Sequence, residues 1–494
     1  MNYISTRSAA EALPGHQAVI QGLCPDGGLY VPDSLDISID PGTLLNKSYQ
    51  ETAAIIISAF FPDYPEETIR QCVNAAYDEK FDDPAIVPLK LFQDGAFMEL
   101  WHGPTSAFKD LALTILPHLL TAAYREDARN DTVAILTATS GDTGKAALSG
   151  FADVEHTNIT VFYPVNGVSA IQKRQMVTSR GANVNVVAVE GNFDDCQRMV
   201  KTACSDETVK EACNGVTISS ANSINIGRLV PQIVYYFSTY VSLVKEGTIR
   251  NGEEISFVVP TGNFGDIFAG YLAKAAGLPV KRLVVASNDN NVLTDFIRTG
   301  TYNRKRPFHE TISPSMDILV SSNLERLLYF ASGKNTELVS SLMKQLNGEG
   351  SYSVPAEMLE TIQRDFSAYW CDEDTCRREI ASLFKTEGIL IDPHTAVGLG
   401  ALRQYQADGN TEYAVVLSTA SPFKFAQDVL SCISETTPED AFEAMKELSE
   451  KSGMPIPKGL AELESLPVRF DTVIPNSEGI SWIASKMKEL SSHD

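Results

Sequence analysis

Short apolar runs alternate with helical segments from about residue 130 onward, and this alternation restricts the fold more than any other feature of the sequence. The runs have the length of buried strands, and glycine-containing turns follow several of them. They cover residues 133–137, 159–163, 183–189, 255–259, 281–286 and 413–418. Strands separated by helices in this way form parallel sheets with crossover helices. Because the runs fall into two series, we expect an α/β fold with two parallel or mixed sheets and a ligand between them.

The length of 494 residues indicates more than one domain, because single hydrophobic cores stop growing at about 250–300 residues. An apolar helix is expected at 49–61, and a longer helix at 226–245. A polar, helix-rich segment at about 300–385 lacks clear strand alternation and is expected to be an insertion. The predicted division is an N-terminal domain at 1–90, a small α/β domain at 131–247, and a large domain at 91–130 and 248–494.

The formal net charge is −23, and the acidic residues are spread along the chain. That sign argues against a nucleic-acid partner, whose phosphates require a basic surface, but a small local pocket could still bind a phosphorylated molecule. The eight cysteines include no CxxC pair, so we expect reduced thiols and no metal site.

The N-terminal residues, MNYISTRSAAEALPG, contain no apolar run of the kind that a secretory signal needs. The longest apolar stretch, at 53–61, is far shorter than the roughly 20 residues of a membrane-spanning helix. We therefore predict a cytoplasmic protein without membrane contact.

Two glycine-containing turns each follow an apolar run and open a helix, the place where α/β folds bind ligands. The turn PTGNFGD at 260–266 has glycines that allow close backbone approach, and the helix behind it offers free amides to a phosphate. It is neither a Walker A loop nor a GxGxxG fingerprint. The turn TSGDTG at 139–144 suits an anion. Taken alone, the first could be a plain connecting loop and the second an ordinary helix cap.

A third turn, WHGPTSAFKD at 101–110, places Lys109 in an apolar setting. A lysine in such surroundings is a candidate for a depressed pKa and for covalent chemistry with a carbonyl group. Most lysines are merely solvated, so this residue by itself would decide little.

Together the three turns resemble those of fold-type II pyridoxal-phosphate enzymes. Further motifs are similar to those of the threonine synthase family, in the branch with a long N-terminal segment. The motifs are HGPTSAFKD, TSGDTG, EGNFDDCQ, NSINIGR, PTGNFGDIFAGY, DPHTAVG and STASPFKF, with STR and CPDGGLYVP near the N-terminus. They run from residue 5 to residue 425 in the order of the family.

The resemblance implies conversion of O-phospho-L-homoserine and water into L-threonine and phosphate, with pyridoxal 5'-phosphate as the cofactor held in the large domain. An alternative on the same fold is a phospho-lyase or threonine dehydratase that releases a keto acid. A non-catalytic binding protein is a further alternative, but it should have lost Lys109 or the phosphate loop, and both are present. A monomer or homodimer is expected.

By the same resemblance, Lys109 forms the Schiff base with the cofactor and then acts as acid and base. The expected cofactor contacts are Gly262, Asn263, Phe264, Gly265, Thr419 and Asp142. The expected substrate contacts are Ser140 and Thr143 at the carboxylate, and Asn222, Ser223, Arg228 and Lys424 at the phosphate.

Some of these residues have plainer alternatives. Arg228 could lie on the surface of its helix, and Lys424 could face water. His102 and His394 are expected to be packed or hydrogen-bonded rather than catalytic. The sequence also departs from the family at Ser421, where histidine is common.

Overall fold

Two large sheets carry the fold of the computed structural model, which describes residues 1–9, 11–129, 131–139, 141–204 and 206–491. The first sheet has six strands in the order β13-β10-β9-β14-β4-β3. Its strands are β3 (Leu89–Phe92), β4 (Gly95–Glu99), β9 (Ile255–Pro260), β10 (Val280–Ser287), β13 (Phe366–Trp370) and β14 (Ala414–Ser418). The β3–β4 pair is antiparallel and the other described pairs are parallel. The expected α/β fold with parallel or mixed sheets is confirmed.

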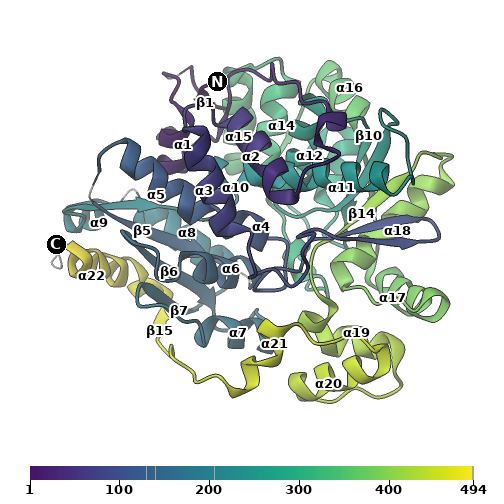
Figure 1. Cartoon of the computed structure of the whole chain (residues 1–494). Helices are drawn as coiled ribbons and strands as arrows, with labels where there is room; N and C mark the ends of the chain where they lie inside the picture. The colour runs from purple at the N-terminus through teal and green to yellow at the C-terminus, as the bar shows by residue number, and fades with distance from the viewer. Residues whose placement is uncertain (10, 130, 140, 205, 492–494) are drawn as a thin grey trace.

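The second sheet is parallel, with five strands in the order β15-β7-β6-β5-β8. Its strands are β5 (Thr132–Ala138), β6 (Thr157–Pro164), β7 (Val184–Glu190), β8 (Val216–Ser219) and β15 (Val473–Pro475). The first sheet lies to the right in Figure 1 and the second to the left, so the two series of apolar runs build separate sheets.

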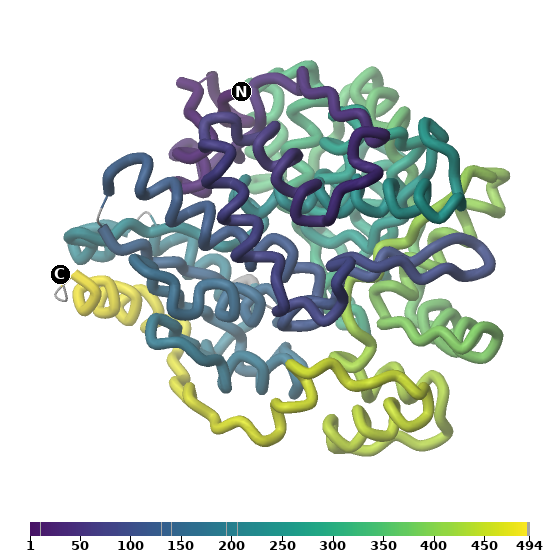
Figure 2. Tube along the Cα trace, in the orientation of Figure 1, coloured from purple at the N-terminus to yellow at the C-terminus, as the bar shows by residue number. Residues whose placement is uncertain are grey.

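The C-terminal segment returns to the second sheet, although the predicted division assigned all of 248–494 to the large domain. The yellow tube in Figure 2 runs beneath the molecule from right to left and ends beside the small sheet. There β15 pairs with β7, and helix α22 (Gly479–Ser491) buries Ile483 and Met487 in the core of that sheet. A strand of three residues leaves no apolar run in the sequence, so pattern alone could not place it.

The N-terminal segment packs as a helical layer on the same core as the large sheet. It contains β1 (Tyr3–Ser5), α1 (Gly15–Gln21), β2 (Tyr30–Pro32), α2 (Tyr49–Phe60) and α3 (Glu66–Ala76). Helix α2 begins at a capping box, in which Ser48 and Glu51 satisfy each other's backbone amides. The helix predicted at 49–61 is therefore confirmed to within one residue.

The helix predicted at 226–245 is interrupted. Helix α10 (Ile226–Leu229) leads through a 3-10 turn at Val230–Gln232 into α11 (Ile233–Lys245). Pro231 has no amide hydrogen to continue the α-helical pattern, and the side chain of Gln232 donates instead to the Arg228 carbonyl, at 2.8 Å.

The segment at 300–385 is helical but also supplies a sheet strand, contrary to expectation. Its helices are α14 (Leu324–Ala331), α15 (Thr336–Glu349), α16 (Ala356–Asp365) and α17 (Glu373–Glu387). Between the last two, β13 pairs in parallel with β10. Polar residues alternate with buried ones in FSAYW, as expected of an edge strand. Because β13 is not a continuous apolar run, the sequence pattern did not predict it.

The remaining helices cover the sheets and place loops at the carboxyl ends of the strands. They include α4 (Asp110–Leu113), α5 (Leu116–Glu126), α6 (Asp142–Phe151), α7 (Ala170–Val177), α8 (Phe193–Ala203), α9 (Glu207–Ala212), α12 (Gly265–Ala275), α13 (Val292–Thr299), α18 (Pro393–Ala407), α19 (Ala426–Ile433), α20 (Ala441–Ser452) and α21 (Lys458–Ala461). Among the described residues, no helix has the length and apolar character needed to cross a membrane. The same residues contain no group of three or more His, Cys, Asp or Glu side chains that could hold a metal ion.

Candidate functional site

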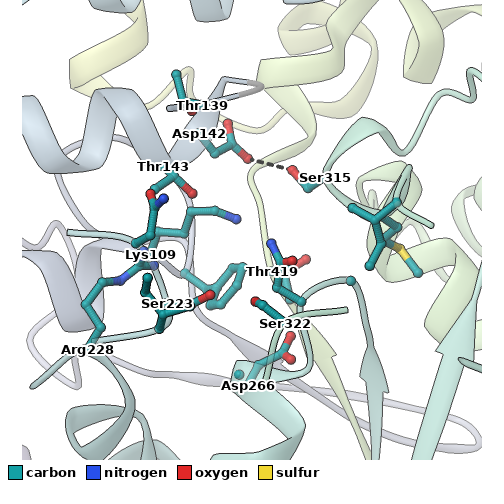
Figure 3. A pocket seen from close by; sticks show the side chains of 18 of the residues that line it. Lys109, Thr139, Asp142, Thr143, Ser223, Arg228, Asp266, Ser315, Ser322 and Thr419 are labelled. Atoms are coloured by element: carbon teal, nitrogen blue, oxygen red, sulfur yellow. Dashed lines mark hydrogen bonds between the residues drawn. The ribbon is translucent and has the colours of Figure 1, made fainter. Parts of the chain in front are cut away.

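One cavity collects the loops that follow strands of both sheets (Figure 3). Its empty volume, including the open mouth, is about 1230 Å³. Of the predicted residues, those that line it are Lys109, Asp142, Thr143, Asn222, Ser223, Arg228, Gly262, Asn263, Gly265 and Thr419. Ser140 lies outside the described residues.

Lys109 stands at the start of α4, and the preceding loop is tied to the end of β14. The amide of Phe108 donates to the Thr419 carbonyl at 2.8 Å, and the amide of Ser421 donates to the Ser106 carbonyl at 3.1 Å. These bonds place Lys109 beside Thr419, with its ammonium in the middle of the cavity (Figure 3). Burial lowers the pKa of Lys109 to about 8, a value suited to a group that must both give and take protons.

Asp142 begins α6 and faces two ammonium groups. Its Oδ1 lies 2.6 Å from Nζ of Lys424 and accepts a bond of 3.0 Å from Gln172. Burial alone would raise the pKa of Asp142, but the charges of Lys424 and Lys109 outweigh it and hold that pKa well below its usual range. Asp142 is therefore a carboxylate, and a negative charge is fixed next to Lys109.

Lys424 is fully buried, so the alternative that it faces water is wrong. Besides its ion pair with Asp142, its ammonium donates to the Thr105 carbonyl at 3.0 Å. The side chain lies behind the wall of the cavity rather than among the described residues that line it. The predicted contact of Lys424 with a substrate phosphate stays a prediction.

The loop between β9 and α12 has the form of an anion cradle. Phe264 adopts a left-handed conformation, with φ of 65°, and α12 begins at the next residue without a side-chain cap from Phe264. The Phe264 ring is buried in the core, so this residue can serve a ligand only through its backbone. A Cβ on Gly262 would come within 2.7 Å of the Ser315 carbonyl oxygen, which accounts for glycine there. Backbone amides at a helix start fit a phosphate group.

Arg228 is buried, so the alternative of a surface residue is also wrong. Its Nη1 donates to the Ala221 carbonyl at 2.8 Å, while Nε has no hydrogen-bond partner within the described part of the chain. Burial lowers the pKa of Arg228 to about 10, so the guanidinium remains charged at neutral pH. A buried cation with an open donor, next to Asn222 and Ser223 in the cavity wall, is suited to a second anion.

His394 lines the cavity, and its hydrogen bonds fix its ring. Nδ1 lies 2.6 Å from the fully buried Asp392, and Nε2 accepts from the Ser315 amide at 3.1 Å. The expectation of a hydrogen-bonded histidine is confirmed, and the ring anchors the loop around residue 315. His102 is likewise held between Asp82 and Glu99.

Sequence reasoning missed much of the cavity wall. The missed residues include Phe193, Gln197, Lys201, Asp266, Ser315, Met316, Ile318, Val320 and Ser322. Five of them belong to the segment at 300–385, which reaches the cavity as a loop with one short 3-10 turn (Pro314–Met316). The sequence of this loop carries no strand or α-helix pattern. The EGNFDDCQ motif around α8 was a usable signal for Phe193 and Gln197.

Comparison with known proteins agrees with this geometry. The sequence model of the family described as pyridoxal-phosphate dependent enzyme matches residues 97–421. The models described as threonine synthase N terminus and as threonine synthase, C-terminal, match residues 2–77 and 395–481.

Relatives match over most of this chain. Threonine synthase-like 1 of Homo sapiens is 39% identical over 432 residues, which are 84% of this chain and 58% of the relative. The chain thus spans little more than half the length of that relative. Threonine synthase of Pseudomonas aeruginosa is 40% identical over 434 residues, which are 87% of this chain and 90% of the relative.

A solved structure of threonine synthase from Brucella melitensis with pyridoxal phosphate bound has the same fold. Its TM-score is 0.88, with 36% identity and coverage of 99% of both chains. The expected family and the expected type of fold are therefore confirmed. The chain belongs to the threonine synthase family of pyridoxal-phosphate-dependent enzymes.

Proposed function

We propose that this chain is a threonine synthase, which converts O-phospho-L-homoserine and water into L-threonine and phosphate. One observation carries the proposal: a single cavity holds the buried Lys109 between two sites for anions. One is the amide cradle at 262–265, and the other is the open guanidinium of Arg228. A phosphorylated cofactor and a phosphorylated substrate need two such sites on either side of the reacting lysine.

The residues of the first site fit pyridoxal phosphate. The backbone amides of Asn263, Phe264 and Gly265, which follow Gly262, would hold its phosphate, and Lys109 would be the point of covalent attachment. Thr419 at the end of β14 would meet the ring nitrogen, and Asp142 would lie at the ring. When bound, the cofactor supplies the electron sink that stabilises negative charge on the substrate.

Lys109 then moves the protons of the reaction. With a pKa lowered to about 8, its amine can take protons from the α-carbon and then the β-carbon of the substrate. It can return one proton to the γ-carbon once the phosphate has left and another to the α-carbon. Asn222, Ser223 and Arg228 would hold the phosphate as it leaves the γ-carbon. Thr143, with Ser140, would hold the substrate carboxylate. Water adds at the β-carbon and completes threonine.

Lys424 would reach the substrate phosphate only after leaving Asp142, to which it is paired at 2.6 Å. We propose that its first task is to neutralise Asp142 and so to prevent that carboxylate from holding Lys109 permanently protonated.

The rival dehydratase or phospho-lyase would release a keto acid in place of threonine. A simple dehydratase would not need the buried guanidinium of Arg228 with its available Nε donor, because its substrate carries no phosphate. The test is a product assay on purified protein loaded with pyridoxal phosphate and supplied with O-phospho-L-homoserine. Equal amounts of threonine and phosphate support the proposal, and phosphate with a keto acid supports the lyase. Lys109→Ala should lose both products and the visible absorption band of the bound cofactor.

The predicted domain division is retained as part of this proposal, with residues 473–491 moved to the small domain because β15 pairs with β7. The inferred location is cytoplasmic and the inferred state is a monomer or homodimer. Gel filtration at several protein concentrations tests the second inference.

A further inference from the structure

Asn323 lies between the two proposed phosphate sites without lining the cavity among the described residues. It stands just before α14 and is completely buried. Its side-chain Nδ2 donates to Oγ of Ser223 at 3.0 Å and to the carbonyl of Asn263 at 2.9 Å. Its backbone amide donates to the same Asn263 carbonyl at 3.0 Å. One residue therefore bonds to both anion-binding loops.

The orientation of the Asn323 amide is fixed by Arg326. Oδ1 of Asn323 accepts from Nη1 of Arg326, whose guanidinium is also completely buried. The other nitrogens of Arg326 are engaged too, with Nε donating to the Tyr30 carbonyl at 2.9 Å and Nη2 to the Ile224 carbonyl at 2.6 Å. Because a guanidinium can only donate, the oxygen of the amide must face it and the NH₂ group must face the loops.

This orientation determines what Ser223 can offer a ligand. A hydroxyl has a single hydrogen to donate and two positions at which it accepts. Ser223 accepts from Asn323, and no acceptor for its own hydrogen is found among the described residues, so that hydrogen can serve an acceptor in the cavity, which Ser223 lines. A phosphate group is such an acceptor.

The same contacts turn carbonyl oxygens of the cofactor loop away from the anion position. Asn323 binds the Asn263 carbonyl twice, and Oγ of Ser321 donates to the Gly262 carbonyl at 2.8 Å. Amide hydrogens rather than carbonyl oxygens are then left to face an anion. The loops are close together here, because a Cβ on Gly265 would lie 3.4 Å from Nδ2 of Asn323 and 3.6 Å from Cβ of Ser223.

We propose that Asn323, locked by Arg326, is a positioning residue that orients the donors of both phosphate sites at once. It aims the hydroxyl of Ser223 at the substrate phosphate and holds the loop at 262–265 open for the cofactor phosphate. The inference rests on the proposed function for the substrate site. Through Tyr30, Arg326 also ties this arrangement to the N-terminal segment.

Asn323→Asp is the sharpest test. The carboxylate has nearly the same shape and still accepts from Arg326, so the fold is retained. It cannot donate to Ser223 or Asn263, and it adds negative charge between two anion sites. Glu325→Gln is the matched control, because Glu325 is also buried and lies only two residues further along the chain, in α14. Glu325 binds Thr6 at 2.5 Å and Arg7 at 2.7 Å, both in the N-terminal segment.

The probes are pyridoxal phosphate and pyridoxal, which lacks the phosphate, each titrated into cofactor-free protein. Asn323→Asp should weaken the binding of pyridoxal phosphate about tenfold or more and leave the binding of pyridoxal unchanged, as expected when donors to a charged group are lost. Glu325→Gln should change neither. In the assay, Asn323→Asp should raise the KM for O-phospho-L-homoserine about tenfold while kcat changes less. The proposal would be overturned if Asn323→Asp bound both molecules as the wild type does, or if it lost affinity for both equally.

Asn323→Ala provides the second variant if the aspartate protein does not fold. It removes the amide without adding charge. The affinity for pyridoxal phosphate should therefore still fall relative to that for pyridoxal, but by a smaller factor. If the wild-type protein makes no threonine, the proposed function fails, whereas the comparison of pyridoxal phosphate with pyridoxal still tests the role of Asn323.

Discussion

The ammonium of Lys424 lies 2.6 Å from the carboxylate of Asp142, and both side chains are buried beside the cavity that contains Lys109. Asp142 therefore shares its charge between two lysines. Lys424 makes the direct ion pair, and Lys109 is left in surroundings where burial dominates and lowers its pKa to about 8. The pair explains how a carboxylate can stand beside Lys109 without fixing a proton on it.

Asp142→Asn should lower the pKa of Lys109 further, because the charged ammonium loses an attractive partner. The expected decrease is about 1 unit, typical of one nearby charge. The measurement is the pH dependence of the rate at which cofactor-free protein captures pyridoxal phosphate covalently, since only the deprotonated amine reacts. The midpoint should move to lower pH. Asp471→Asn, at an exposed position, is the control and should leave it in place; an unmoved midpoint in Asp142→Asn would show that the two groups do not interact.

Arg228→Met should weaken substrate binding and stabilise the protein without ligand. The guanidinium is buried with one nitrogen unpaired among the described residues, so its removal relieves a desolvation cost of about 1 kcal/mol. The KM for O-phospho-L-homoserine should rise at least about tenfold, as for loss of a hydrogen bond to a charged group. Thermal unfolding of protein loaded with pyridoxal phosphate, with and without inorganic phosphate, provides the check. Phosphate should stabilise the wild type but not the variant, and equal stabilisation of both would rule out a phosphate contact at Arg228.

The cores of the sheets could be predicted, and Lys109 could be singled out, because both leave local signals. A buried strand such as β9 is a continuous apolar run, and Lys109 sits in a motif with a clear family resemblance. Strands β13 and β15 could not be predicted, because an edge strand alternates with polar residues and a three-residue strand has no pattern at all. Their place depends on pairing with distant strands.

Contacts between residues far apart in the sequence were equally hidden. No spacing rule joins Asp142 to Lys424, or Asn323 to Ser223 and Asn263, and those contacts decide what the site residues can do. The wall around residues 315–322 is an irregular loop held by side-chain hydrogen bonds. Its composition alone suggested an insertion of unknown role.

His102→Gln should cost stability at neutral pH but not at high pH. His102 is mostly buried; this burial lowers its pKa, but Asp82 at 2.6 Å and Glu99 at 3.0 Å outweigh it and raise that pKa to about 9. A raised pKa contributes stability that is fully present below the unfolded value of about 6.5 and is lost as the pH rises through about 9.

The contribution of His102 should be of the order of 2 kcal/mol, reduced by solvent screening at the half-exposed Asp82. Denaturant unfolding of both proteins at pH values on either side of this window measures it. The difference between wild type and variant should be largest near pH 6 and should vanish near pH 10. A difference that is independent of pH would mean that His102 contributes packing only.

Gly262→Ala should impair cofactor binding. Its Cβ would come within 2.7 Å of the Ser315 carbonyl oxygen, and a backbone atom cannot move aside as a flexible side chain can. The loop must therefore shift, and we expect about tenfold weaker binding of pyridoxal phosphate, the effect of one lost bond to a charged group. Equilibrium dialysis of cofactor-free protein measures the affinity. Gly348→Ala, in open space, is the matched control and should bind the cofactor as the wild type does.

The most direct test of the central claim is to run the reaction in water labelled with a heavy oxygen isotope. Mass spectrometry then measures the isotope content of both products. In the proposed reaction the bond between the γ-carbon and oxygen breaks and water adds at the β-carbon. The label should therefore appear in the hydroxyl group of threonine and be absent from the released phosphate. Labelled phosphate would indicate simple hydrolysis of the phosphate ester, and a keto acid in place of labelled threonine would indicate a lyase. Either result would contradict the account.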